Sequence, residues 1–128
     1  MIKKTAGKII LDGRSQPWEH EMRVARILSR DGHNVEFIPP ALTRTADILL
    51  DGVEFEIKSP QGNKLTTIER NLKRATKQSR NIVFDSSRMK QMSDRKILQN
   101  IIYHAKHQKL IKRVIFIGKN GKITDLTF

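Results

Sequence analysis

The chain has 128 residues, 38% of them hydrophobic and 30% charged, which fits a single globular domain over residues 1–128 and excludes a disordered segment. It lacks cysteine, which excludes disulfides and Cys-based zinc sites, and it has no run of about 18 apolar residues that would cross a membrane. The net charge is +12, and the whole excess follows Pro60, where 16 Lys and Arg stand against 4 Asp and Glu. This asymmetry favours a polyanionic partner, first of all nucleic acid, over a merely well-solvated surface.

The first half of the chain predicts one helix between short strands. Pro17 stands where a helix begins, and Asp31-Gly32 supply its C-terminal stop. The apolar face of this helix repeats at helical spacing at Trp18, Met22, Ala25 and Leu28. Ile9–Leu11 is expected as a strand or an ordered arm, and Val35–Ile38 as a strand that Pro39-Pro40 stop, with a loop to Thr45.

A β-hairpin is predicted around Asp51-Gly52, which separates the apolar runs Ile48–Leu50 and Val53–Ile57. Asp-Gly favours a two-residue turn because both of its positions need a positive φ. This turn fixes the strand register and sets Asp47 opposite Glu56, with side-chain Cβ atoms about 5 Å apart. Side chains alternate between the two faces of a strand, so Lys58 is expected on the same face as Glu56.

The second half predicts two helices and three strands. A helix is expected over residues 66–79, and Ser93 is expected to cap another whose apolar stripe includes Ile97 and Ile101. Strands are expected at Asn81–Asp85, at Val114–Gly118 and around Ile123–Leu126, with Asn120-Gly121 as a two-residue turn between the last two. The resulting order indicates an α/β or α+β domain with a central mixed sheet flanked by helices.

Three carboxylates stand out as candidate metal ligands. Glu21 falls on the apolar face of the first helix, and a buried glutamate needs a partner, either a structural Arg or Lys or a metal site. Asp47 and Glu56 would repel each other across the hairpin, and a cation would relieve that repulsion. Carboxylate oxygens are the ligands that Mg²⁺ prefers, and Mn²⁺ and Zn²⁺ are the alternatives.

The four residues Glu21, Asp47, Glu56 and Lys58 together fit metal-dependent phosphodiester hydrolysis. The carboxylates would hold the ion, and Lys58 would orient the water or offset negative charge. Taken singly the signals are weak, because Asp47 could be a strand-end turn residue and Glu56 with Lys58 a surface ion pair.

The helix expected over residues 66–79 adds polar and basic groups. Its polar stripe consists of Thr67, Asn71, Arg74 and Gln78, and Gln78 would border the candidate site. The alternative is that the stripe is an ordinary boundary between the apolar and polar faces of the helix. The residues expected to meet phosphates are Lys73, Arg74, Lys77 and Arg80.

The pattern resembles the PD-(D/E)xK nuclease superfamily, whose α-β-β-β-α-β core has the order predicted from the first helix to the Asn81–Asp85 strand, although Ala46 stands where the name has Pro. More closely, the segments EMRVARILSRDGHNV, TADILLDG, FEIKS and TTIERNLKRATKQSRNIVFD resemble the C-terminal tRNase toxin domains of contact-dependent growth inhibition systems. The resemblance implies metal ligation by Glu21, Asp47 and Glu56, catalysis with Lys58, and auxiliary roles for Ser59 and Gln78.

It also implies tRNA as the substrate, an acidic cognate immunity protein as a partner, and a secreted or surface-delivered fragment that acts in the cytoplasm of a target cell. A DNase of the same fold remains an alternative, because hydrolysis by water does not use the 2′-OH. A non-catalytic nucleic-acid-binding module is the second alternative. It explains the charge but leaves the Asp47–Glu56 opposition without a reason.

Overall fold

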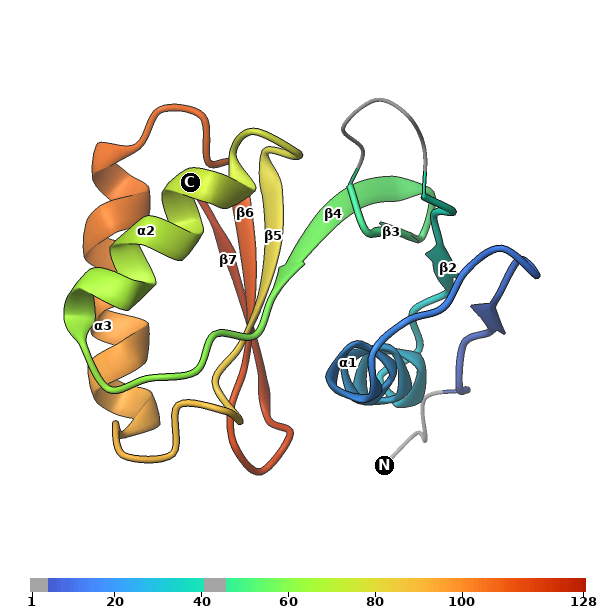
Figure 1. The fold of residues 1–128 in the computed structure, drawn as a ribbon, viewed down its shortest axis with the longest axis horizontal. Coiled ribbons are helices and arrows are strands. Elements are labelled where there is room, and N and C mark those ends of the chain that lie inside the picture. Colours follow the sequence, from blue (N-terminus) through green and yellow to red (C-terminus); the bar gives the residue numbers. More distant parts are fainter. Residues whose placement is uncertain (1–4, 41–45) are drawn as a thin grey trace.

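A computed structural model describes residues 5–40 and 46–128, so that the loop expected up to Thr45 lies partly outside the described residues. Within these ranges the chain forms three helices and a seven-stranded sheet (Figure 1). The helices are α1 (Glu19–Arg30), α2 (Leu65–Ala75) and α3 (Asp94–His107). The strands are β1 (Ile9–Ile10), β2 (Val35–Phe37), β3 (Ile48–Leu50), β4 (Val53–Lys58), β5 (Asn81–Asp85), β6 (Arg113–Ile117) and β7 (Ile123–Thr127).

The strands lie in the sheet in the order of the sequence, and the sheet is mixed as predicted. The pairs β1–β2, β4–β5 and β5–β6 are parallel, and β2–β3, β3–β4 and β6–β7 are antiparallel. From α1 to β5 the elements follow the order helix, three strands, helix, strand, as expected. The assignment of this order to the PD-(D/E)xK core remains a prediction.

Each face of the sheet is covered by helices and has its own core. On one face α1 contributes Val24 and Leu28, which pack with Phe55 and Ile57 of β4. On the other face α2 and α3 pack against alternate residues of β5 and β6, such as Phe84. Figure 1 shows α2 and α3 on one side of the strands and α1 on the other. Because successive residues of β4 alternate between these faces, Glu56 and Lys58 belong to the face opposite Ile57.

The helix ends follow local chemistry, with some shifts from the prediction. α1 begins at Glu19 rather than at Pro17, after the extended residue Trp18. α2 ends at Ala75, four residues earlier than expected, and a turn follows it. The predicted cap of α3 is confirmed, because the Ser93 hydroxyl accepts a hydrogen bond from the Lys96 backbone N–H.

One of the two predicted hairpin turns is confirmed, and the other differs. Asp51 and Gly52 have φ values of 50° and 84°, as a two-residue turn with two left-handed positions requires. In the β6–β7 hairpin, the Gly118 N–H donates to the Lys122 carbonyl at 2.9 Å, which leaves three residues in the loop. Gly121 takes the left-handed position there, with φ 86°, so the expected two-residue Asn120-Gly121 turn is wrong.

Candidate active site at the fork of the sheet

β4 changes its hydrogen-bonded partner halfway along its length. Val53–Phe55 pair with β3, whereas Glu56–Lys58 pair with β5. Asp47 lies one residue beyond the Ile48–Phe55 pair, which sets it opposite Glu56 as the register predicted. Its backbone N–H donates to the Phe55 carbonyl at 3.2 Å, and its Oδ2 accepts from the Ile57 N–H at 2.8 Å. The Asp47 carboxylate therefore accepts a β4 N–H just beyond the last β3–β4 pair. We call this place, where β4 changes its partner from β3 to β5, the fork of the sheet.

Glu56 occupies an electrostatically unfavourable position at this fork. Its side chain is only 9% exposed, and its Oε1 is buried without a hydrogen-bond partner among the described residues. Burial, together with the hydrogen bond and charge of Asp47, raises the pKa of Glu56 to about 8. Lys58 opposes this shift, since its Nζ lies 3.5 Å from Glu56 Oε2. Of the predicted residues, Glu56 thus interacts with both Asp47 and Lys58.

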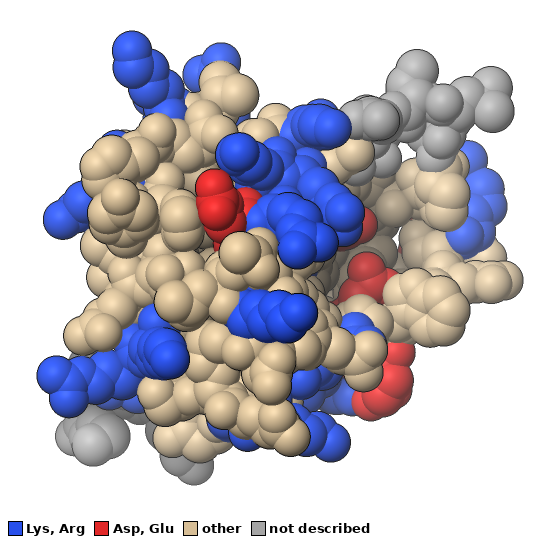
Figure 2. All heavy atoms as spheres, turned by 60° about the vertical axis from the view of Figure 1, so that its left-hand side comes forward, with Lys and Arg blue, Asp and Glu red and all other residues tan. Residues whose placement is uncertain are grey.

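Gln78 and two of the basic residues that were predicted to meet phosphates lie around the same pocket as Lys58. Lys58, Arg74, Lys77 and Gln78 line a pocket of about 370 Å³. The Gln78 Oε1 is buried without a hydrogen-bond partner in the described part of the chain. Figure 2 shows a cluster of Lys and Arg side chains beside a hollow in which acidic side chains are visible. The pocket combines a primary amide and three cations, which suits a phosphate group.

The other two basic residues predicted to meet phosphates are exposed, and they do not line this pocket. Lys73 lies 3.8 Å from Glu69 on the same helix. The Arg80 carbonyl accepts the Lys112 N–H, which ties the chain before β5 to the chain before β6.

Ser59 is anchored to a buried carboxylate that sequence reasoning missed. Asp85, at the end of β5, has no exposed surface, and it accepts hydrogen bonds from the Ser59 hydroxyl at 3.0 Å and from the Ser87 hydroxyl at 2.9 Å. Arg23 of α1 is a further partner of Asp85, with its Nη1 2.9 Å from Asp85 Oδ1. The signal was present, because Asp85 is one of only four acidic residues after Pro60 and ends an apolar strand. Asp85 ties the residue after Lys58 to both β5 and α1.

Glu21 has a different environment from the one either prediction assigned to it. Its Oε1 accepts a hydrogen bond from the Trp18 backbone N–H at 2.8 Å, as a carboxylate in the first turn of a helix does. Within residues 5–40 and 46–128, no three His, Cys, Asp or Glu side chains form a group that could hold a metal ion. The structure thus brings Asp47 and Glu56 together but does not group Glu21 with them.

The comparison with protein families decides what kind of domain carries this site. The model of the contact-dependent growth inhibition CdiA C-terminal domain matches residues 44–123, more than half of the chain. The chain belongs to this family. The matched part of this CdiA C-terminal domain includes Asp47, Glu56, Lys58 and Gln78, whereas Glu21 lies before it.

A solved structure has the same fold as this CdiA C-terminal domain. It is a chain of the CdiA-CT/CdiI toxin and immunity complex from Burkholderia pseudomallei, with a TM-score of 0.66 and 22% sequence identity. The similarity covers 95% of this chain and 100% of that one. No curated protein matches. In the described part of the CdiA C-terminal domain, no helix is long and apolar enough to span a membrane.

Proposed function

We propose that this CdiA C-terminal domain is a toxin with metal-dependent endonuclease activity, built on a PD-(D/E)xK core, whose substrate is tRNA. One observation carries the proposal: Glu56 meets both Asp47 and Lys58 at the fork of the sheet, and its Oε1 has no hydrogen-bond partner among the described residues. Two facing carboxylates are costly unless a proton or a cation lies between them.

Asp47 and Glu56 fit a divalent cation by their chemistry. Both present carboxylate oxygens, and the unpartnered Oε1 of Glu56 is a ligand atom that nothing else in the described chain uses. Mg²⁺ is the first choice for such oxygen ligands, and Mn²⁺ and Zn²⁺ are alternatives. When bound, the ion would supply an activated water and offset negative charge on the phosphate. Glu21 would join as a third ligand only if its carboxylate moved towards Asp47 and Glu56, because the described structure does not group the three.

The remaining residues would bind and orient the phosphodiester. The Lys58 ammonium group, held 3.5 Å from Glu56, is placed to orient the attacking water or to stabilise charge that develops on the phosphate oxygens. The Gln78 amide, Arg74 and Lys77 line the same pocket and would hold the neighbouring phosphate. The Ser59–Asp85 hydrogen bond fixes the backbone directly after Lys58, which limits its movement.

The proposal extends to how the domain is delivered and neutralised. A nuclease must be kept from the nucleic acids of the cell that makes it, so we propose delivery into the cytoplasm of a target cell and an acidic immunity protein. The net charge of +12 and the toxin–immunity complex of the similar structure support such a partner.

Cleavage of total tRNA, with plasmid DNA in parallel, tests the proposed activity. We expect tRNA to be cut with Mg²⁺, Mn²⁺ or Zn²⁺ present, to give 5′-phosphate and 3′-hydroxyl ends, and Glu56→Gln and Lys58→Ala to abolish the reaction. Glu54→Gln is the matched control, because Glu54 lies two residues earlier on the same strand face but is exposed. Undiminished cleavage in excess EDTA, or by Lys58→Ala, would refute the mechanism, and cleavage of plasmid alone would reassign the enzyme as a DNase.

A further inference from the structure

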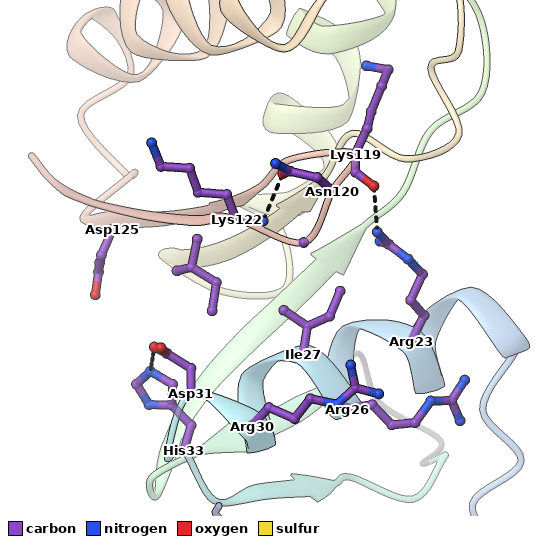
Figure 3. A pocket seen from close by; sticks show the side chains of 12 residues that line it. Arg23, Arg26, Ile27, Arg30, Asp31, His33, Lys119, Asn120, Lys122 and Asp125 are labelled. Carbon is purple, nitrogen blue, oxygen red and sulfur yellow. Dashed lines mark hydrogen bonds and ion pairs between the residues drawn. The ribbon is translucent and has the colours of Figure 1, made fainter. Parts of the chain in front are cut away.

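A second basic hollow lies away from the candidate active site, between α1 and the β6–β7 turn. Its volume is about 1040 Å³. Figure 3 shows side chains from α1 on one side and from the β6–β7 turn on the other. Five cationic side chains line it, namely Arg23, Arg26 and Arg30 from α1 and Lys119 and Lys122 from the turn. Among the lining residues that the structure describes, the carboxylates are Asp31 and Asp125.

This hollow opens on the other face of the sheet from Glu56 and Lys58. Ile27 and Ile123, which line it, pack on the core that contains Phe55 and Ile57. Glu56 alternates with these two β4 residues and therefore faces the opposite side of the sheet. The hollow is thus distinct from the pocket around Lys58.

Two of the five cationic side chains are engaged in contacts within the protein. Arg23 contacts Asp85 at 2.9 Å and donates to the Lys119 carbonyl at 3.2 Å, which holds α1 against the β6–β7 turn. Lys119 is in turn 3.1 Å from Asp94, so its charge is also neutralised. These contacts join the two sides of the hollow.

The two carboxylates of the hollow also have contacts of their own. Asp125 is 2.6 Å from Arg113, and Asp31 is 3.5 Å from His33. Both contacts use groups other than the arginines that line the hollow.

The other three cations are available to a ligand. Among the described residues Arg26 pairs with Glu19 alone, whose side chain is 84% exposed, and such surface pairs contribute little. The structure gives Arg30 and Lys122, both exposed, no side-chain partner among the described residues. Arg26 and Arg30 are one helical turn apart, about 6 Å along the axis of α1, and Lys122 lines the hollow from the β6–β7 turn, with its side chain pointing away from α1 (Figure 3). Three cationic side chains therefore line this hollow, and two of them have no side-chain partner on the described chain.

We propose that this hollow binds the phosphate backbone of the nucleic acid, as a second contact on the face of the sheet opposite the active site. The inference rests on the proposed function for its ligand. Guanidinium groups match phosphate oxygens in pairs, and a row of them suits a repeating anion. An acidic protein is the competing ligand, but protein interfaces usually centre on aromatic or other large apolar anchors. No Phe, Tyr or Trp of the described chain lines the hollow, and interfaces with nucleic acid are more positively charged than interfaces between proteins.

Salt-dependent binding of labelled tRNA in EDTA tests this second contact. The variant is Arg30→Ala with Lys122→Ala, and the matched control is Lys90→Ala with Lys96→Ala, two exposed lysines outside the hollow. Each phosphate contact contributes about 0.7–0.9 to the slope of log K against log salt, so the variant should lower the slope by about 1.4–1.8. At 0.1 M salt the same relation predicts an affinity loss of about 25- to 60-fold. The control should keep the slope of the unmodified protein.

Equal affinities and slopes for variant and control would overturn the inference, as would failure of the unmodified protein to bind tRNA. A variant that binds tRNA like the control but loses binding to poly-glutamate would assign the hollow to an acidic protein instead. Cleavage is scored separately through Lys58 and EDTA, so an active nuclease with an unchanged slope refutes only the second contact.

Discussion

The Glu56→Gln substitution tests the electrostatics of the fork without any assumption about a substrate. With its pKa raised from 4.5 to about 8, Glu56 stays protonated in the folded protein at a pH where the unfolded chain ionises. The contribution of protonated Glu56 to the free energy of unfolding is therefore fully present below pH 4.5 and is lost as the pH rises towards 8. Glutamine has nearly the shape of a protonated glutamate and does not titrate, so the variant should escape this loss.

The expected size of the effect follows from the shift. At about 1.36 kcal/mol per pKa unit, ionisation in the unfolded state costs the unmodified protein about 3 kcal/mol at pH 7 and about 5 kcal/mol at pH 9. The variant should be more stable by these amounts at pH 7 and pH 9, and equal to the unmodified protein near pH 4.

Urea unfolding in EDTA at pH 4, 7 and 9 measures the difference directly. Glu54→Gln again serves as the control, because Glu54 is exposed and its substitution should change stability equally little at all three values. If the difference in free energy of unfolding between Glu56→Gln and the unmodified protein stayed constant with pH, a raised pKa of Glu56 would be refuted.

Three further outcomes follow from contacts already described. Asp85→Ala should lower the free energy of unfolding by about 3–5 kcal/mol in urea, because it leaves the Arg23 charge without its buried partner, and a loss below 1 kcal/mol would contradict this. Gln78→Leu should reduce the proposed tRNA cleavage about 10²-fold while urea unfolding shows no loss of stability, since Oε1 has no partner in the described part of the chain to lose; unchanged cleavage would remove Gln78 from the site. Gly52→Ala should cost about 1–2 kcal/mol in thermal unfolding because φ is 84°, whereas Gly13→Ala, equally free of neighbours but without a positive φ, should cost less; equal losses would contradict the turn geometry.

The sequence predicted the hairpin half of the candidate site well, because its determinants are local. Asp51-Gly52 fixed the turn, and the turn fixed the register that sets Asp47 opposite Glu56. The cap at Ser93 was predictable for the same reason, since a capping hydroxyl reaches only three residues along the chain.

The rest of the site depends on contacts between residues far apart in the chain. Periodicity placed Glu21 on the apolar face of its helix, but it could not show that the carboxylate turns back to the Trp18 N–H. The network around Asp85 joins α1, β4 and β5, and no short motif encodes it. The three-residue β6–β7 loop was missed because a Gly that follows Asn serves either kind of hairpin.

The change of partner along β4 also bears on the order in which the site is assembled during folding. The β3–β4 hairpin needs contacts only a few residues apart, whereas the β4–β5 pairing must wait for a segment that contains α2. Local pairing precedes long-range parallel pairing because it loses less chain entropy. We therefore expect Asp47 and Glu56 to meet early, and Lys58 and Gln78 to come together only when β5 docks. A partly folded chain would carry the two carboxylates without the pocket, so the proposed nuclease activity would report on the completed fold.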